Sequence, residues 1–196
     1  MSKRVVDVIV AAGALVVLSP LLAAVAVAVQ LESPGGALFR QLRVGKNGKT
    51  FQILKFRSMR VDTNGPEVTS ARDSRITRVG RLIRSTKLDE LPQLVNVLRG
   101  EMSLVGPRPE VAKYVAHWPP EDREVILSVR PGITDPASVA FRREAEILAT
   151  QEDPERFYIE RILPEKVALY RQYVQKRSTI GDLKVLAETV RRTLGG

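Results

Sequence analysis

The longest apolar stretch of the chain is Val8–Val29, a run of 22 residues with no charged side chain and one hydroxyl, Ser19. At 1.5 Å per residue, a helix of this length is long enough to cross the hydrocarbon core of a bilayer. Ser19-Pro20 lies near its middle, where proline removes a backbone hydrogen bond and kinks or breaks a helix. The freed carbonyl needs another donor, and the Ser19 hydroxyl is the candidate. The pattern predicts two apolar half-helices joined at Ser19-Pro20.

Three arrangements of this apolar run remain open from the residues alone. Lys3 and Arg4 precede it, which favours a cytoplasmic N-terminus. A kinked spanning helix would place the rest of the chain outside, whereas a hairpin that enters and leaves on one face would keep it in the cytoplasm. A cleaved signal peptide is the third arrangement, because Ala24–Ala26 imitates a cleavage site, although the run continues to Leu31.

The next segments alternate between extended and helical patterns. Residues 37–43 and 50–56 are predicted strands, joined by a turn at Asn47-Gly48. Residues 61–73 are polar and are predicted to form a loop. Residues 75–85 combine an apolar side with an arginine at every third position, so they predict a basic amphipathic helix that lies either on a membrane surface or on the core. Further helices are predicted over 110–118, 121–129, 144–150, 154–162, 165–177 and 183–194, and a short strand over 138–141.

Between these elements lies Asp89-Glu90, followed by Pro92 and a short apolar run. A helix that begins near Asp89 or Glu90 would carry Leu91, Leu94, Val95 and Leu98 on one face, and Gly100 is placed to end it. Arg84 and Lys87 lie just before the acidic pair. The two carboxylates are then either an N-cap with a solvated acidic first turn, or a reaction centre at the positive end of a helix.

Composition narrows the choice of class and partner. The 196 residues suit one domain, the absence of Cys excludes disulfides and Cys-based metal sites, and the single His117 excludes a His-rich one. The net charge is +9, and residues 40–87 hold 13 Lys and Arg against 3 Asp and Glu. Such a block indicates a polyanionic partner. Nucleic acid is disfavoured, because aromatic residues do not interleave with the basic ones.

Seven motifs then occur in a fixed order, and together they carry a specific resemblance. They are K-R-V-V-D-V with the Ser19-Pro20 break, Q-L-R-V-G-K-N-G-K-T-F, K-F-R-S-M, R-L-I-R-S-T-K-L-D-E-L-P-Q-L, G-E-M-S-L-V-G-P-R-P, R-P-G-I-T and G-D-L-K. From Lys3 to about Leu194 the chain resembles a bacterial sugar transferase of the monotopic phosphoglycosyl transferase superfamily, in its minimal form. The resemblance implies a mixed α/β, membrane-anchored fold with a small β-hairpin and surrounding amphipathic helices. Residues 1–34 would form a re-entrant helix-break-helix anchor and residues 35–196 a cytoplasmic catalytic domain.

The resemblance also implies a reaction and a location. Members transfer a sugar phosphate from a UDP-sugar to a polyprenol phosphate such as undecaprenyl phosphate and release UMP, as the first membrane step of glycoconjugate synthesis. Asp89 would be the nucleophile that forms a covalent phosphosugar-aspartyl intermediate, Glu90 would complete the catalytic dyad, and Mg²⁺ would be the cofactor, near or on Asp89. The expected location is the cytoplasmic face of the bacterial inner membrane, beside anionic lipid.

This chemistry requires cations, because an anionic carboxylate that attacks an anionic diphosphate is repelled. Lys55, Arg84, Arg108 and Arg142 match family positions at the active site. Each is, from sequence alone, equally well a solvated surface cation. The full set of candidate phosphate- and nucleotide-binding residues is Lys55, Arg57, Arg84, Arg108, Arg130 and Arg142.

Four departures from the family pattern fall late in the chain and leave the identity of the sugar open. They are Asp135-Pro136, Ala140–Arg142, Tyr170 and an apparent insertion at 144–163. The polyprenol length, the pathway product and the oligomeric state, a homo-oligomer included, are open as well. Two functions of other classes remain alternatives: a non-enzymatic anchor whose basic face binds anionic lipid, and a secreted basic binding protein.

Overall fold

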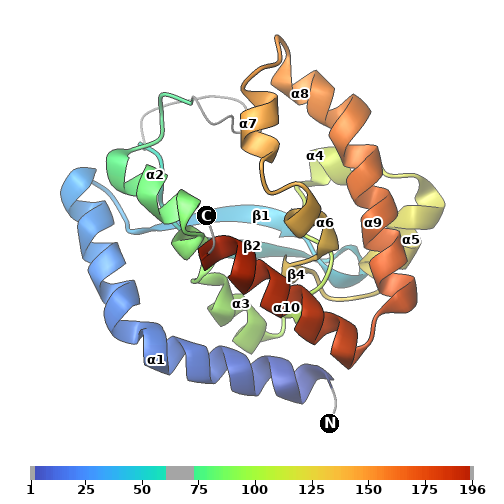
Figure 1. Ribbon diagram of the computed structural model, residues 1–196, viewed down its shortest axis with the longest axis horizontal. Coiled ribbons are helices and arrows are strands. Elements are labelled where there is room, and N and C mark those ends of the chain that lie inside the picture. Colours follow the sequence, from blue (N-terminus) through green and yellow to red (C-terminus); the bar gives the residue numbers. More distant parts are fainter. Residues whose placement is uncertain (1–2, 61–72, 195–196) are drawn as a thin grey trace.

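The computed structural model describes residues 3–60 and 73–194 (Figure 1). A long bent helix, α1 (Lys3–Glu32), follows the edge of the molecule, and the other elements gather on its inner side. Strands and helices are mixed, as the predicted fold class requires. The predicted loop at 61–73 lies, apart from Asp73, outside the described residues. The helices after α1 are α2 (Arg78–Ser85), α3 (Gln93–Arg99), α4 (Ala112–Val115), α5 (Pro120–Leu127), α6 (Pro136–Ala140), α7 (Glu144–Leu148), α8 (Pro154–Phe157), α9 (Leu163–Lys176) and α10 (Thr179–Leu194).

The predicted break in the apolar run is a bend within one helix. α1 contains Pro20, and Figure 1 shows it turning in its middle. Ser19 Oγ donates to the carbonyl of Val16 at 2.8 Å. Val16 is the residue four positions before the proline, whose carbonyl the missing N–H leaves without its helical partner. The predicted role of the Ser19 hydroxyl is therefore confirmed.

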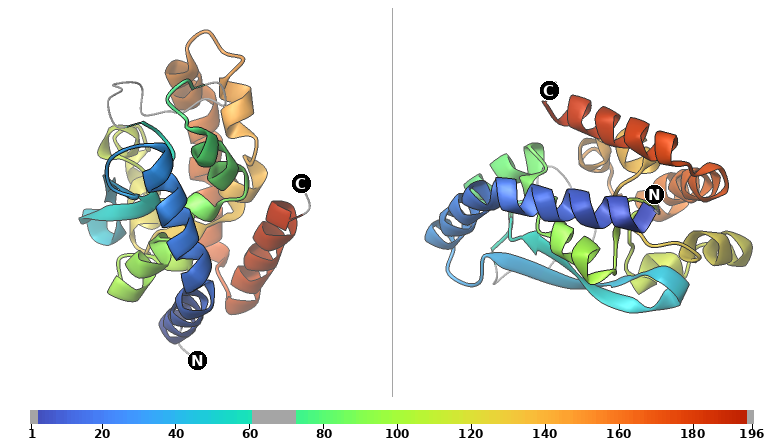
Figure 2. Two further views of the ribbon diagram at one scale, coloured as in Figure 1. Left: turned by 90° about the vertical axis from the view of Figure 1, so that its left-hand side faces the viewer. Right: turned by 90° about the horizontal axis from the view of Figure 1, so that it is seen from below.

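Much of the outer side of α1 is exposed in the described part of the chain. Val16 and Val17 are 74% and 77% exposed, and Leu31 is 83% exposed. Within the described residues, α1 is the one helix that is long and apolar enough to cross a membrane. Figure 2 shows it lying along one side of the molecule. An apolar surface of this extent is typical of contact with lipid.

The first turns of α1 are bonded to the rest of the domain. Lys3 Nζ lies 2.5 Å from a carboxylate oxygen of Asp182 in α10, and Arg4 donates to a backbone carbonyl of α3 at 2.7 Å. Asp7 is buried and accepts from Ser103 Oγ at 2.8 Å. These bonds make α1 part of the fold, which argues against its removal as a signal peptide.

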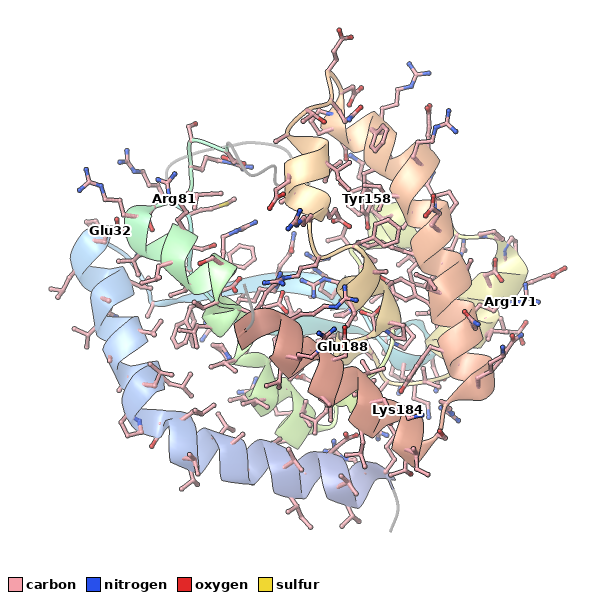
Figure 3. All side chains as sticks on the ribbon, viewed as in Figure 1. Glu32, Arg81, Tyr158, Arg171, Lys184 and Glu188 are labelled. Carbon is pink, nitrogen blue, oxygen red and sulfur yellow. The ribbon has the colours of Figure 1, made fainter. Side chains whose placement is uncertain are left out.

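The last turn of α1 is joined to the first turn of α2. Both carboxylate oxygens of Glu32 accept backbone N–H groups, from Arg78 at 2.7 Å and from Val79 at 2.8 Å, and Figure 3 shows Glu32 at this end of α1. The predicted amphipathic helix is thus present as α2. It packs on the core through Ile83, which is 2% exposed, while Leu82 points outward with 63% exposed.

The predicted hairpin forms one antiparallel sheet. Strand β1 (Leu38–Val44) pairs with β2 (Thr50–Phe56), with Val44 opposite Thr50 and Leu38 opposite Phe56. Asn47 and Gly48 have φ values of 57° and 75°, the left-handed conformation for which Asn-Gly is preferred in hairpins. Both predicted strands and their turn are confirmed.

A second sheet was not predicted. Strand β3 (Ser103–Val105) pairs in parallel with β4 (Gly132–Thr134). Three-residue strands are too short to show an alternating pattern in a sequence. Here the pairing depends on two glycines, because a Cβ at Gly132 would lie only 2.1 Å from the backbone nitrogen of Gly106.

Two local predictions are wrong. The strand predicted at 138–141 is helical, because Asp135 caps α6 by accepting from the backbone N–H of Ala137 at 2.7 Å and Pro136 occupies its first turn. The central helix, α3, begins at Gln93 and not at Asp89. Its buried face consequently holds Gln93, Leu94, Asn96 and Val97, and Leu98 is 38% exposed.

The remaining helices lie where the sequence predicts them, with shifted ends. The apparent insertion at 144–163 forms α7, α8 and the first part of a continuous helical segment in which a π-helical turn, Tyr158–Ile162, leads into α9. Leu148, Tyr158 and Ile162 from this insertion are at most 3% exposed in the largest core cluster. The insertion is therefore an integral part of the core.

Candidate active site

Asp89 and Glu90 lie in a short 3-10 turn, η2 (Leu88–Glu90), between α2 and α3. Lys87 has a left-handed φ of 57°, which turns the chain sharply after α2. Pro92 occupies the N-cap of α3, which has no side-chain capping bond. The capping interpretation of Asp89 is therefore wrong. The helix-dipole argument fails with it, because the seven-residue α3 starts beyond the acidic pair.

Glu90 is held between two largely buried cations. Lys55 Nζ donates to Glu90 Oε1 at 2.9 Å, and the Arg108 guanidinium donates to Oε1 at 2.5 Å and to Oε2 at 3.3 Å. Burial raises the pKa of Glu90, but Arg108 and then Lys55 outweigh burial and hold this pKa well below its ordinary value. Glu90 is thus an ionised group that fixes the position of both cations.

Asp89 is as deeply placed but has no such partner. Its side chain is buried, and Oδ1 receives no hydrogen bond from the part of the chain that the structure describes. The pKa of Asp89 is raised above its ordinary value. Burial and then the charge of Glu90 raise it, and together they outweigh Lys55, Arg84 and Lys87, which lower it. A buried carboxylate oxygen without a donor costs free energy, so its presence indicates a place where a ligand completes the bonding.

Lys55 reaches Glu90 because Asn96 joins β2 to α3. The Asn96 side chain is fully buried, accepts from the backbone N–H of Leu54 at 3.0 Å and donates to the carbonyl of Gln52 at 2.8 Å. These two bonds replace a neighbouring strand along this part of β2. They hold α3, and the η2 turn before it, at a constant position beside Lys55.

Arg108 reaches Glu90 through the β3–β4 pairing. Gly106 donates its N–H to the carbonyl of Thr134 at 3.0 Å, and Gly132 donates to the carbonyl of Pro107 at 2.9 Å. Gly106 and Pro107, the first two residues of the G-P-R-P motif, are therefore hydrogen-bonded to β4. The proline on either side of Arg108 restricts the backbone further, so the guanidinium projects from a rigid turn.

The other predicted cations differ in their surroundings. Arg84, in the last turn of α2, lies 3.5 Å from Ser58 Oγ and lowers the pKa of Asp89. Arg142 lies between α6 and α7 and forms no hydrogen bond or ion pair with the described residues. Arg84 is thus close to Asp89, whereas no hydrogen bond or ion pair among the described residues joins Arg142 to Asp89 or Glu90.

Arg57 and Arg130 are engaged elsewhere. Arg57 is buried and donates to the carbonyls of Ser33 and Pro34, the latter at 3.0 Å, so it ties the end of β2 to the turn after α1. Arg130 Nε donates to the carbonyl of Gly100 at 2.8 Å. The structure gives Arg57 a structural role and brings neither arginine into contact with Asp89 or Glu90.

The site can accept the Mg²⁺ ion that the resemblance implies. Among residues 3–60 and 73–194, no group of three or more Asp, Glu and His side chains could hold a metal by itself. Mg²⁺ often binds one or two carboxylates together with substrate phosphates. The unpartnered Oδ1 of Asp89 is such a donor, whereas both Glu90 oxygens already accept from cations. The arrangement fits an ion shared by Asp89 and a bound diphosphate.

Two charged residues that the sequence does not predict as site residues interact electrostatically with groups of the site. Lys87 lowers the pKa of Asp89, and its left-handed backbone does not follow from its residue type. Asp135 is fully buried, and burial raises its pKa while hydrogen bonds from Ser138 and then the charge of Arg108 lower it. Its role could have been recognised, because Asp followed by Pro is typical of a helix start.

Comparison with known proteins gives a consistent result. A model of the family described as bacterial sugar transferase matches residues 1–196. A UDP-glucose:undecaprenyl-phosphate glucose-1-phosphate transferase of Caulobacter vibrioides is 42% identical over 193 residues, which are 96% of this chain and 68% of that protein. A transferase of the same name from Escherichia coli is 39% identical over 96% of this chain and 39% of its own length.

A third relative is named for a different sugar. The UDP-N-acetylgalactosamine-undecaprenyl-phosphate N-acetylgalactosaminephosphotransferase of Aeromonas hydrophila is 39% identical over 201 residues, 99% of this chain and 44% of that protein. The chain thus spans less than half of the length of the second and third of these relatives.

Proposed function

Because the chain belongs to the bacterial sugar transferase family, we propose that it transfers a sugar 1-phosphate from a UDP-sugar to a polyprenol phosphate and releases UMP. One observation carries the proposal: within the described residues, Asp89 keeps a buried oxygen without a hydrogen-bond donor, directly beside a glutamate that accepts from two cations. Asp89 is therefore available to react, and Glu90 fixes the positions of the cations beside it. Relatives named for glucose and for N-acetylgalactosamine match about equally well, so the proposal leaves the sugar open.

The proposed reaction has two steps. An Asp89 oxygen attacks the phosphorus of the sugar-linked phosphate, the bond from that phosphorus to the bridging oxygen breaks, and UMP leaves with the electron pair. Asp89 then carries the phosphosugar as an acyl phosphate. In the second step an oxygen of the polyprenol phosphate attacks the same phosphorus, the bond to Asp89 breaks, and the carboxylate is restored. The product is a polyprenol diphosphate-sugar.

The cations around the dyad offset the repulsion between the carboxylate and the phosphates. Lys55, Arg84 and Lys87 all act on the charge of Asp89, and Glu90 holds Lys55 and Arg108 as a pair. Charges fixed in this way need no reorganisation when negative charge moves onto the leaving UMP. When bound at Asp89 and the diphosphate, Mg²⁺ would add neutralising charge of the same kind.

We further propose that α1 is re-entrant and that the domain lies on the cytoplasmic face of the inner membrane. The support is that both ends of α1 are bonded to the same domain, through Lys3 to Asp182 at its start and through Glu32 to α2 at its end. A straight helix of 30 residues would separate its ends by about 45 Å and place them on opposite sides of a bilayer. A cytoplasmic domain also agrees with the preference for Lys and Arg on that side.

Cysteine labelling tests this topology, because the chain has no Cys of its own. Lys46→Cys, in the exposed hairpin turn, should resist a membrane-impermeant maleimide in intact cells and react after lysis. A periplasmic cysteine in a known protein of the same membrane serves as the positive control. Labelling of Lys46→Cys in intact cells would exclude the re-entrant arrangement.

The reaction is tested with the purified chain in nanodiscs, a panel of UDP-sugars and undecaprenyl phosphate. Release of UMP should require Asp89, and Asp89→Asn should lower its rate by at least about a thousandfold, as loss of a covalent nucleophile does. Wild type incubated with a UDP-sugar labelled in the sugar should retain label on the protein, and Asp89→Asn should not. Full UMP release by Asp89→Asn would refute the nucleophile assignment.

A further inference from the structure

A polar cavity lies at the other end of α1 from its junction with α2. It has a volume of about 400 Å³ and is bordered by the first turns of α1, the hairpin turn, and the corner between α9 and α10. Figures 1 and 2 show the start of α1 beside the corner between α9 and α10. None of Lys55, Arg84, Asp89, Glu90 or Arg108 lines it. We call it the α1–α10 pocket.

The pocket carries an excess of positive charge. Five cations line it, Lys3, Arg4, Lys46, Arg130 and Arg177, against two acidic residues, Asp7 and Asp182. Both acidic groups are occupied inside the protein. Asp182 accepts from Lys3 and from Tyr173 Oη at 2.7 Å, and Asp7 accepts from Ser103. Lys3 Nζ lies 2.5 Å from Asp182 and 3.9 Å from Asp7, and the five cations still outnumber the two carboxylates.

The four other cations lack an ion-pair partner among the described residues. Arg4 and Arg130 donate to uncharged backbone carbonyls at Val97 and Gly100, which fixes their positions and leaves their charge unbalanced. Lys46 and Arg177 are exposed and form no ion pair with the described part of the chain. A concave site with this balance favours an anion, and arginines held in place suit the oxygens of a phosphate.

The surroundings of the pocket identify the kind of anion. Val5 and Ile9, on α1, are 45% and 58% exposed, and Ile180 and Leu183, on α10, are 69% and 57% exposed. These apolar side chains lie on the same helices as the pocket residues, within about one turn of them. A free phosphate would use only the cations. A phospholipid would use both, with its headgroup among the cations and its acyl chains against the apolar side chains.

We propose that the α1–α10 pocket binds the phosphate headgroup of an anionic phospholipid. Its lipid would hold the start of α1 against the α9–α10 corner at the membrane surface. Four of the five pocket cations lie outside the basic block at 40–87, and Lys46 is the one that belongs to it. The inference rests on the membrane placement of α1 proposed above and is independent of the transfer reaction.

The test uses the full chain in neutral detergent, with thermal unfolding and native mass spectrometry as lipid is added. The pocket variant is Lys46→Gln with Arg177→Gln, two exposed residues. The matched control is Arg161→Gln with Lys184→Gln, which removes the same charge from exposed residues outside the pocket. Phosphatidylglycerol is the probe, with phosphatidylcholine, inorganic phosphate and UMP as separate arms.

Phosphatidylglycerol should bind the wild type and the control variant with similar affinity and raise the apparent Tm of both. It should bind the pocket variant at least about tenfold more weakly, because that variant lacks two juxtamembrane cations. Equal binding by the pocket variant and the control would overturn the proposal. Equal protection by inorganic phosphate or UMP would overturn the lipid assignment in favour of a soluble anion. UMP release is measured in parallel, so that an inactive protein which still binds phosphatidylglycerol separates this inference from the proposed reaction.

Discussion

Replacing Glu90 by Gln removes the carboxylate to which both Lys55 and Arg108 donate. Gln keeps the size of the side chain but carries no charge, so two cations are left without their counter-ion. Lys55 and Arg108 have side chains that are only 17% and 27% exposed, and water reaches them poorly. The variant therefore measures how much the charged core of the site contributes to the fold.

The expected loss follows from this burial. Removal of one partner of a buried ion pair costs about 3–5 kcal/mol, because the remaining charge stays uncompensated. Because Lys55 and Arg108 are still partly exposed, we expect the loss for Glu90→Gln to stay within this range of about 3–5 kcal/mol and not to exceed it. In a protein of this size about 1 kcal/mol corresponds to about 2–4 °C in Tm, so the apparent Tm should fall by roughly 6–20 °C.

The assay is thermal unfolding in nanodiscs near neutral pH, with Glu188→Gln as the matched control. Glu188, on the exposed side of α10 (Figure 3), also accepts from two arginines, Arg191 at 2.8 Å and Arg192 at 2.5 Å. Those arginines are 73% and 42% exposed. An exposed cluster of this kind should contribute little to stability, because solvent screens its charges. The two variants thus remove the same type of interaction at different burial.

The dependence on pH has a definite sign. The pKa of Glu90 is lowered in the folded protein, so its contribution is complete above the ordinary pKa of a glutamate and is lost as the pH falls through the lowered value. The difference in Tm between wild type and Glu90→Gln should be constant near neutral pH and shrink only in strong acid. Equal Tm losses for Glu90→Gln and Glu188→Gln would refute the reasoning.

Two further substitutions test the supporting structure. Asp135→Asn keeps an acceptor for the amides of α6 and removes a carboxylate whose pKa burial raises. Because a raised pKa makes the wild type less stable as pH increases, the Tm of Asp135→Asn minus that of wild type should rise as the pH increases above the ordinary pKa of an aspartate, and a falling difference would contradict this. Gly80→Ala would place a Cβ 2.0 Å from the carbonyl oxygen of Ser58, and should lower the free energy of unfolding by at least about 1–3 kcal/mol. Gly13→Ala, with nothing within 4 Å, should be neutral or slightly stabilising, and similar losses for both glycines would show that the contact at Gly80 is unimportant.

Features that depend on neighbours in the sequence were predictable. Pro20 acts on the helix that contains it, and Ser19 bonds a carbonyl three residues earlier. Asn47-Gly48 specifies a tight turn through its own backbone preferences. The helix start at Asp135-Pro136 is equally local, because the cap and the proline of the first turn are both adjacent to α6 in the sequence.

Features that depend on distant segments were not predictable. The β3–β4 pairing requires close backbone contact between two glycines from separate segments. Each strand has only three residues, which is too short to show an alternating hydrophobic pattern in the sequence. The buried face of α3 also differs from the predicted one. The hydrogen bonds between Asn96 and β2, and not the spacing of apolar residues, decide which side of the helix faces inward.

The acidic pair shows most clearly the difference between what neighbouring residues determine and what distant segments determine. The sequence alone determined that two carboxylates stand side by side at Asp89 and Glu90, within a set of motifs and behind a broken apolar helix. It could not assign different states to them. Glu90 is paired with Lys55, 35 positions earlier, and with Arg108, 18 positions later, while Asp89 keeps a buried oxygen that receives no hydrogen bond from the described part of the chain. Ion pairing and desolvation act through distance in space, so only the tertiary structure decides which of two adjacent carboxylates is held and which is free.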